Sequence, residues 1–80
     1  MQLFPNPGTG YFSANVKVKK PGLAKISIQN YLGQVVEMKK NSLPEGESNI
    51  PFNLTIMKPG IYLLNIEITG EVINSKFIKK

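Results

Sequence analysis

The sequence of 80 residues contains no cysteine, histidine, tryptophan, aspartate or arginine. Without cysteine the chain can form neither a disulfide framework nor a thiolate metal site, and cysteine usage gives no indication of the redox compartment. The absence of histidine and aspartate excludes Ser-His-Asp triads, Cys-His dyads, imidazole metal sites and the usual magnesium carboxylates. Glutamates are the remaining side-chain carboxylates, so we expect a domain that is not an enzyme and uses no cofactor.

The length of the chain predicts one small domain, which buries about 60 to 65% of the surface that its unfolded form exposes. Such a domain holds one core and no deep active-site cleft. No apolar run approaches the roughly 18 residues of a membrane span, and the N-terminus lacks the charged-then-apolar pattern of a signal peptide. Met1 is followed directly by Gln2-Leu3-Phe4-Pro5. We interpret this as a start on an internal boundary, so residues 1–80 are predicted to be a piece of a longer protein.

The charge balance is basic, with ten lysines against five glutamates and a net charge of +5. A basic chain is compatible with nucleic acid, an anionic lipid surface or an acidic partner. Base-specific readout and planar phosphate recognition rely on arginine, however, and the lysines are scattered through predicted strands and turns. We therefore expect no nucleic-acid partner, and we interpret the lysines as a solvated face or as guards of sheet edges.

Apolar and polar residues alternate at period two through most of the chain, and no segment keeps a helical period for about ten residues. This pattern predicts an all-β fold. Short strands separated by turn residues are typical of a β-sandwich or a small barrel. The predicted strands are Tyr11–Val18, Ala24–Gln29, Gln34–Lys39, Ser48–Leu54, Ile61–Thr69 and Glu71–Lys79, and a short edge strand over Gln2–Phe4 would make seven.

Two hairpins can be predicted in more detail. In the first, residues 31–33 fit a three-residue loop with Gly33 in the left-handed region. Its predicted pairs are Asn30 with Gln34, Ile28 with Val36, and Ile26 with Met38. In the second, Thr69-Gly70 fits no favoured two-residue turn well, so the turn does not predict the register. We instead choose the register that gathers the apolar side chains of both strands on one face. Its predicted pairs are Ile66 with Ile73 and Tyr62 with Phe77.

Glycine and tyrosine positions give further expectations. Pro21-Gly22 and Pro59-Gly60 fit type II turns with glycine at positive φ. Tyr62, at the start of its strand, is interpreted as a plain half-buried aromatic; the alternative is a tyrosine corner, in which the hydroxyl bonds to nearby backbone. The residues expected to be largely buried are Ile26, Ile28, Val36, Tyr62, Leu64 and Ile66.

Few groups offer chemistry. Glu45 and Glu47 flank a glycine in a turn that we expect to be exposed and solvated, which is not a setting for general-acid work. The tripeptide Asn53-Leu54-Thr55 matches the N-glycosylation pattern, which is frequent by chance. Tyr11, Phe12 and Tyr31 are candidates for stacking on sugar rings, but single aromatics on a β surface are more often packed across strands.

Four segments follow one another along the chain: Leu3–Gly10, Ile26–Val36, Lys58–Leu64 and Ser75–Lys80, with the motif residues Pro5, Asn6, Pro7, Gly33, Gly60 and Tyr62 within them. Together they resemble the type A C-terminal sorting domain of the type IX (Por) secretion system. Each segment alone is a weak signal, whereas the ordered set covers nearly the whole chain and is fairly specific. The resemblance implies an immunoglobulin-like antiparallel β-sandwich of about seven short strands, at the C-terminus of a larger secreted protein of Bacteroidota.

The function implied by the resemblance is that of a secretion signal. In the family, the parent protein reaches the periplasm through an N-terminal signal peptide, and the outer-membrane translocon then recognises the sorting domain. A surface signal peptidase commonly removes the domain, at a site expected upstream of Leu3, and attaches the cargo to an anionic lipopolysaccharide. The region that the family uses for recognition corresponds to Phe77, Ile78, Lys79 and Lys80. The domain itself is expected to be monomeric and to bind no small-molecule substrate.

A physical mechanism follows from the expected position of the last strand. Pro5 and Pro7 favour a stiff, extended lead-in to the first long strand. A C-terminal edge strand has free backbone donors and acceptors, so a receptor strand is predicted to add to it while Lys79 and Lys80 reach acidic groups. Replacing both lysines is predicted to leave stability nearly unchanged. From the residues alone, a frayed, solvated tail is the preferred interpretation of these two lysines, and the resemblance reverses that preference.

Two other classes of function remain open at this point. An adhesion or carbohydrate-binding module of a secreted protein requires an exposed aromatic platform or an aspartate-rich calcium site, and tryptophan and aspartate are missing. An enzyme requires a nucleophile with a base that activates it, and no such pair is evident. The sorting-domain interpretation is therefore preferred.

Overall fold

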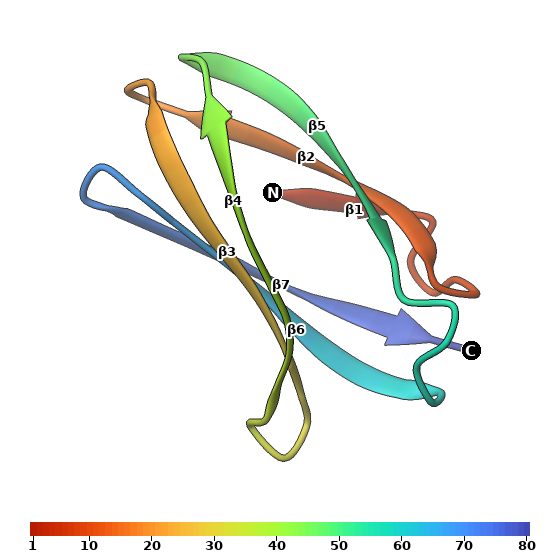
Figure 1. Cartoon of the computed structure of the whole chain (residues 1–80). Helices are drawn as coiled ribbons and strands as arrows, with labels where there is room; N and C mark the ends of the chain where they lie inside the picture. Colours follow the sequence, from red (N-terminus) through yellow and green to blue (C-terminus); the bar gives the residue numbers. More distant parts are fainter.

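The computed structural model describes residues 1–80 as seven β-strands without a helix (Figure 1). Their bounds are β1 (Gln2–Phe4), β2 (Tyr11–Val18), β3 (Gly22–Asn30), β4 (Val35–Leu43), β5 (Gly46–Asn53), β6 (Gly60–Ile68) and β7 (Glu71–Lys79). The all-β prediction is confirmed, and every predicted strand is present, the short β1 included. The main difference is that β4 runs to Leu43 instead of ending at Lys39. No helix is available to cross a membrane.

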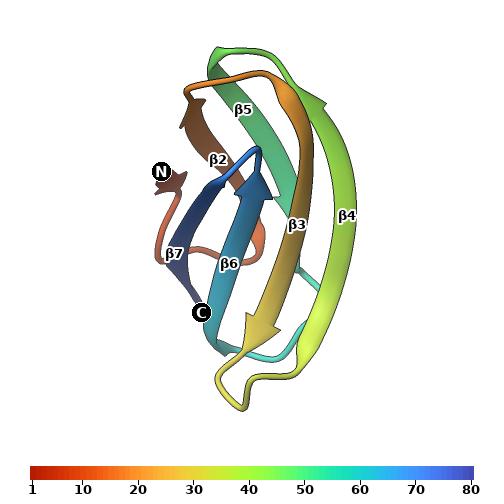
Figure 2. The same cartoon turned by 90° about the vertical axis from the view of Figure 1, so that its left-hand side faces the viewer.

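The strands form two antiparallel sheets that face each other. One sheet has the order β1-β2-β5 and the other the order β4-β3-β6-β7. The chain passes from one sheet to the other after β2, β4 and β5. Figure 2 looks onto the four-stranded sheet, whose strands β7, β6, β3 and β4 follow one another from left to right. This arrangement confirms the predicted immunoglobulin-like β-sandwich.

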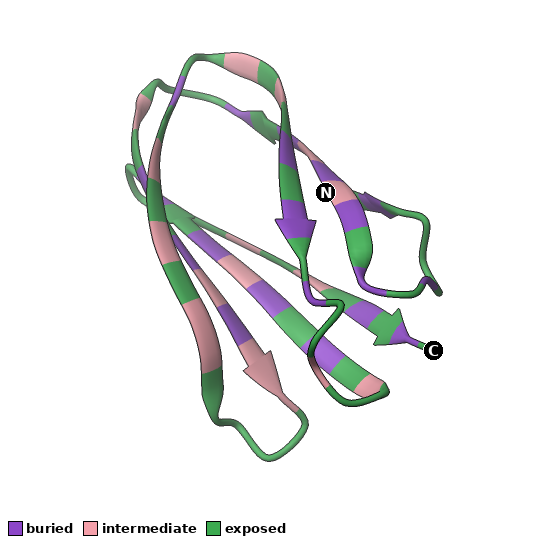
Figure 3. Ribbon diagram, turned by 45° about the vertical axis from the view of Figure 1, so that its right-hand side comes forward, coloured by how far each residue is buried: buried purple, intermediate pink, exposed green.

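The core lies between the sheets because alternate residues of each strand point inward. Figure 3 shows this alternation as stripes of buried and exposed residues along the strands. Near the end of the core where β7 stops, the ring of Phe12 stacks on Phe52 and on Phe77, with centroids 5.1 Å and 4.0 Å apart. Of the residues predicted to be buried, Val36 is only partly so. The confirmed ones are Ile26, Ile28, Tyr62, Leu64 and Ile66.

The loop of the first hairpin has the predicted conformation. Gly33 has a φ of 83°, in the left-handed region. Asn30 faces Gln34, and its amide N–H donates to the carbonyl of Gln34 at 2.9 Å. The loop residues and the local geometry were therefore predictable from the turn chemistry.

Beyond this loop the predicted register is wrong, because a β-bulge interrupts the pairing of β3 with β4. The observed pairs are Gln29 with Val35, Ile28 with Glu37, and Ile26 with Lys39. Val36 is the extra residue of the bulge, so the predicted pairs Ile28 with Val36 and Ile26 with Met38 do not form. Glu37 and Lys39 take the inward positions, and Met38 points to solvent.

The inward position of Lys39 gives a physical reason for this register. β4 and β5 are the edge strands on one side of the sandwich. Lys39 Nζ donates to the carbonyl of Pro51 in β5 at 3.1 Å and lies 4.3 Å from the centroid of the Phe52 ring. A methionine at this place has no donor for that carbonyl. The lysine thus closes the open side of the sandwich and caps an edge acceptor.

The second hairpin has the predicted register. Ile66 lies opposite Ile73 and Tyr62 opposite Phe77. Thr69 and Gly70 have φ values of 35° and 78°. Positive φ at both central residues is the requirement of a type I′ turn, so the expectation that this dipeptide suits no favoured turn is wrong.

The two predicted type II turns do not form. Gly22 is the first residue of β3, lies opposite Leu43 and has no positive φ. Gly60 is the first residue of β6, lies opposite Lys79 and has a φ of 155°. A type II turn needs a φ near about +80° at this glycine. Strand pairing therefore extends over both glycines and overrides the local turn preference.

Candidate functional site

The segments that carry the sorting-domain motif residues converge on one end of the sandwich. The antiparallel registers place the connections 5–10, 31–34 and 54–59 at the end where β7 stops. We call this the terminal end. Figure 1 shows 5–10 and 54–59 beside the C-terminus and 31–34 farther away, at the tip of the β3–β4 hairpin. Tyr62 pairs there with Asn30 on one side and Phe77 on the other. The motif residues at this end are Pro5, Asn6, Pro7, Gly33, Gly60 and Tyr62.

The segment of residues 5–8, the N-terminal strap, crosses the outer edge of β7. Asn6 Nδ2 donates to the carbonyl of Lys76 at 2.8 Å, and the amide N–H of Ile78 donates to Asn6 Oδ1 at 2.9 Å. The N–H of Gly8 then donates to the carbonyl of Ile78 at 3.0 Å, and the N–H of Lys80 donates to the carbonyl of Gly8 at 2.8 Å. The side chain of Asn6 and the backbone of Gly8 thus make the hydrogen bonds to β7 that a neighbouring strand would otherwise make.

Two predictions about this edge are therefore wrong. The strap is bent at residues 5–7, so it is not an extended lead-in. The backbone groups of β7 from Lys76 onward are not free, because Asn6 and Gly8 already satisfy them. A receptor strand can add at this place only if the strap leaves.

The last four residues of the chain have unequal environments. Phe77 is buried and stacks on Phe12. Lys79 is only 7% exposed, and its Nζ donates to the carbonyl of Thr55 at 2.9 Å and to the carbonyl of Met57. Ile78 is 42% exposed and Lys80 is also at the surface. Ile78 and Lys80 are therefore the two of these residues that a partner can touch without rearrangement.

The burial of Lys79 overturns two expectations. It does not extend toward solvent, and it is not a frayed tail, because both of its acceptors lie in the connection between β5 and β6. A buried ammonium group is stable only when its protons are donated to acceptors, and here two backbone carbonyls serve. Its replacement is therefore not neutral for stability.

Tyr62 forms the tyrosine corner that was the less favoured interpretation. Its ring is buried, and its hydroxyl donates to the carbonyl of Lys58 at 2.5 Å. A buried phenol requires such a partner, and the carbonyl four residues upstream supplies it. The interpretation as a plain half-buried aromatic is wrong. Tyr62 and Lys79 together fix the connection 54–59 from two sides.

Sequence reasoning missed Gly10, which brings two connections of the terminal end together. Its carbonyl accepts from the N–H of Leu54 at 2.9 Å, and it has a φ of 123°. A Cβ placed on Gly10 would lie 2.7 Å from the amide nitrogen of Thr55. Only glycine allows this approach of two backbones. No local pattern distinguishes Gly10 from the neighbouring Gly8.

The tripeptide Asn53-Leu54-Thr55 has a structural role at the same place. Asn53 Oδ1 accepts from the N–H of Thr55 at 3.0 Å and from Thr55 Oγ1 at 2.6 Å. This is an Asx-type turn, in which a side chain stands in for a backbone carbonyl. It begins the connection that Lys79 and Tyr62 hold in place.

The comparison with protein families shows which family this chain belongs to. The model of the secretion system C-terminal sorting domain matches residues 2–80. The chain belongs to this family. The resemblance to type IX sorting domains is thereby confirmed, and it places the parent protein among those secreted to the cell surface or beyond. A search of curated proteins finds no match.

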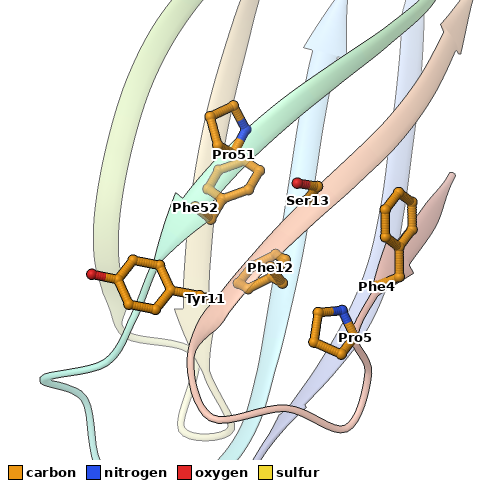
Figure 4. A pocket seen from close by; sticks show the side chains of 7 residues that line it. All are labelled: Phe4, Pro5, Tyr11, Phe12, Ser13, Pro51 and Phe52. Atoms are coloured by element: carbon orange, nitrogen blue, oxygen red, sulfur yellow. The ribbon is translucent and has the colours of Figure 1, made fainter.

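The sorting domain also has a shallow hollow on the outer face of the β1-β2-β5 sheet, of about 280 Å³ (Figure 4). Phe4 is 49% exposed and Tyr11 64% exposed at its borders. Ser13 lies between Phe4 and Pro51 in the strand register. Phe12, which was a candidate for sugar stacking beside Tyr11, instead points into the core.

Proposed function

We propose that this sorting domain directs its parent protein through the outer membrane by way of the type IX translocon, after transit through the periplasm. A surface signal peptidase then removes the domain. The family match over residues 2–80 carries this proposal. The domain acts as a folded signal and takes no part in catalysis.

Recognition is proposed to involve the last four residues in two different ways. Ile78 and Lys80 face solvent, and we assign them direct contact with the translocon. Phe77 and Lys79 are buried, and we assign them the positioning of the strand end. Direct contact by the outward pair requires no displacement of the strap.

The charge at the terminal end supports an acidic partner. Lys58, Lys76 and Lys80 are at or next to this end, and the connections 5–10, 31–34 and 54–59 contain no glutamate. Lys58 and Lys80 are exposed. Cations grouped in this way favour docking against a surface that carries carboxylates, chiefly through a faster encounter and a fixed orientation.

An export assay tests the proposal. Residues Leu3–Lys80 are fused behind a signal peptide and a reporter in a Bacteroidota host whose own type IX system works. The native fusion is expected at the surface or in the medium. The variant with Ile78→Glu and Lys80→Glu is expected to remain in the periplasm, because both changes meet an acidic receptor with like charge. Lys20→Glu, an exposed lysine between β2 and β3, is the matched control.

The melting temperature of each purified domain shows whether the variants still fold. A native fusion that stays in the periplasm would refute the proposed function. Normal export of the Ile78→Glu, Lys80→Glu variant would leave the family function intact and refute the assignment of these two residues.

A second candidate function rests on the hollow between Phe4 and Tyr11. Two exposed aromatic residues, Phe4 and Tyr11, line this hollow together with Ser13, and this lining has the chemistry of a weak platform for a sugar ring. Calorimetry with oligosaccharides, using Tyr11→Ala as the comparison, tests this function. It would be preferred if the domain bound a glycan and the parent protein were secreted normally without the domain.

A further inference from the structure

The largest hollow of the sorting domain lies between two connections of the terminal end. It has a volume of about 610 Å³ and separates residues 31–36 from residues 56–62. We call it the loop groove. Its lining is mainly apolar and includes Tyr31, Leu32, Val36, Ile56, Met57 and Ile61.

The apolar side chains at the loop groove are unusually open to water. Ile56 is 89% exposed and Tyr31 79% exposed, the highest values among the large apolar side chains of the protein. Leu32, next to Tyr31, is exposed as well. These side chains do not pack into the core of the domain. Exposed apolar side chains grouped in this way are typical of a surface that becomes buried in a complex.

The walls of the loop groove are fixed before any partner binds. On one side, Asn30 Oδ1 accepts from the N–H groups of Leu32 and Gln34, both at 3.0 Å. On the other side, Lys79 and Tyr62 hold the connection 54–59 through its backbone carbonyls. A groove with such walls costs little ordering entropy on binding, which favours affinity.

The charge of the lining indicates the chemistry of the occupant. Lys58 is the one charged residue that lines the loop groove, and no carboxylate does. Its side chain is exposed and makes no hydrogen bond within the domain, whereas its backbone carbonyl is used by Tyr62. An apolar segment with a carboxylate beside it complements this lining.

The loop groove is continuous with the proposed recognition face. Ile61 lines the groove and lies directly opposite Ile78 in the pairing of β6 with β7. The strap meanwhile closes the backbone edge beyond Lys76. Contact through side chains can thus spread from the end of β7 over β6 into the groove, while strand addition at the end of β7 is blocked.

We propose that the loop groove binds an extended apolar segment of a translocon protein, with a carboxylate of that segment placed against Lys58. This inference rests on the proposed function and adds a second contact region to it. A concave groove favours a protein segment over a membrane, because a flat lipid surface does not fill a hollow between two loops. The strap stays closed in this mode of recognition.

Charge variants in the export assay test the groove separately from the domain as a whole. Ile56→Glu and Tyr31→Glu are expected to reduce export by about tenfold or more, because each places a carboxylate in the path of an acidic apolar segment. Leu23→Glu and Val72→Glu are the matched controls, since both residues are exposed and lie toward the opposite end. Melting temperatures within about 3 °C of the native domain show that all four variants fold. Ile56→Ser serves if a charged variant does not fold.

The outcomes distinguish the two proposals. If the native fusion is exported and the groove variants are exported equally well, the loop-groove inference is overturned and the proposed function stands. If the native fusion is not exported, the proposed function fails first. Reduced export of the groove variants with normal export of Leu23→Glu and Val72→Glu supports the inference.

Photocrosslinking identifies what occupies the groove. Benzoylphenylalanine at position 56 of the exported fusion is expected to react with an outer-membrane protein, at a peptide that contains apolar residues and an aspartate or glutamate. The same probe at position 72 is the control. An adduct with lipopolysaccharide or phospholipid would overturn the inference in favour of a membrane. An adduct at position 72 without one at position 56 would overturn it in favour of the open part of the β7 edge.

Discussion

Lys79 Nζ donates a hydrogen bond to the carbonyl of Thr55 at 2.9 Å, from the last residue of one strand into the connection between two others. The bond makes the C-terminus part of the fold instead of an appendage. It also gives Lys79 a buried environment, whereas Lys80, which has the same side chain and charge, lies at the surface. Tests that replace both lysines together therefore mix a folding effect with a binding effect.

The first prediction concerns this pair. Lys79→Glu is expected to destabilise the domain by on the order of 3 kcal/mol or more, because a buried carboxylate would face two carbonyl oxygens. Lys80→Glu is expected to change the free energy of unfolding by less than about 0.5 kcal/mol. Urea denaturation of the two variants measures the difference. Equal effects would contradict the burial of Lys79.

The second prediction concerns the strap. Asn6→Ala removes both side-chain hydrogen bonds to β7 and is expected to cost about 1 to 3 kcal/mol. Asn6→Asp keeps the acceptor for Ile78 N–H but loses the donor to the Lys76 carbonyl, so protection of the Ile78 amide is expected to fall less. Hydrogen exchange followed by NMR makes the comparison. An Ile78 amide that exchanges equally fast in the native domain and in Asn6→Ala would show that the strap does not cover the edge.

The third prediction compares two glycines with positive φ. Gly10→Ala is expected to cost about 3 kcal/mol or more, because the new Cβ meets the backbone of residues 54 and 55. Gly33→Ala is expected to cost about 1 kcal/mol, since its surroundings are open and only the backbone preference is lost. Melting temperatures rank the two. A larger loss at Gly33 would be evidence against the close approach at Gly10.

The fourth prediction concerns the core and the bulge. Ile28→Ala and Leu64→Ala are each expected to cost about 2 to 5 kcal/mol, because both side chains are fully buried. Val36→Ala is expected to cost less than about 1.5 kcal/mol, since the bulge leaves this side chain partly exposed. Denaturation curves of the three variants test this order. A cost at Val36 equal to that at Ile28 would support the regular hairpin pairing instead.

The fifth prediction concerns the tyrosine corner. Tyr62→Phe removes the hydroxyl and leaves the carbonyl of Lys58 without its partner, at an expected cost of about 1 to 2 kcal/mol. Because the variant also leaves the connection 54–59 less ordered, export of the reporter is expected to fall. An unchanged free energy of unfolding would show that the bond to Lys58 contributes nothing to stability.

The candidate site was predictable in part. The motif residues chosen from the sequence all lie at the terminal end, where the candidate site is. Glycine, proline and asparagine are informative at turns and strand termini, which is why they indicate this end. The roles of the residues were harder to predict. Lys79 and Lys80 look alike in the sequence, yet the alternation of side chains along β7 sends Lys79 inward and Lys80 outward.

Four features could be predicted from local patterns in the sequence: the strand content, the sheet-facing pattern, the left-handed Gly33 and the register of β6 with β7. Each depends on neighbours along the chain or on the match of two apolar faces. Three other features arise from packing between distant segments: the bulge at Val36, the approach at Gly10 and the capping of the β7 edge by Asn6. Asn6 and Ile78 are 72 positions apart. Contacts over such separations depend on where the packed sheets place each backbone group, and no local pattern records that placement.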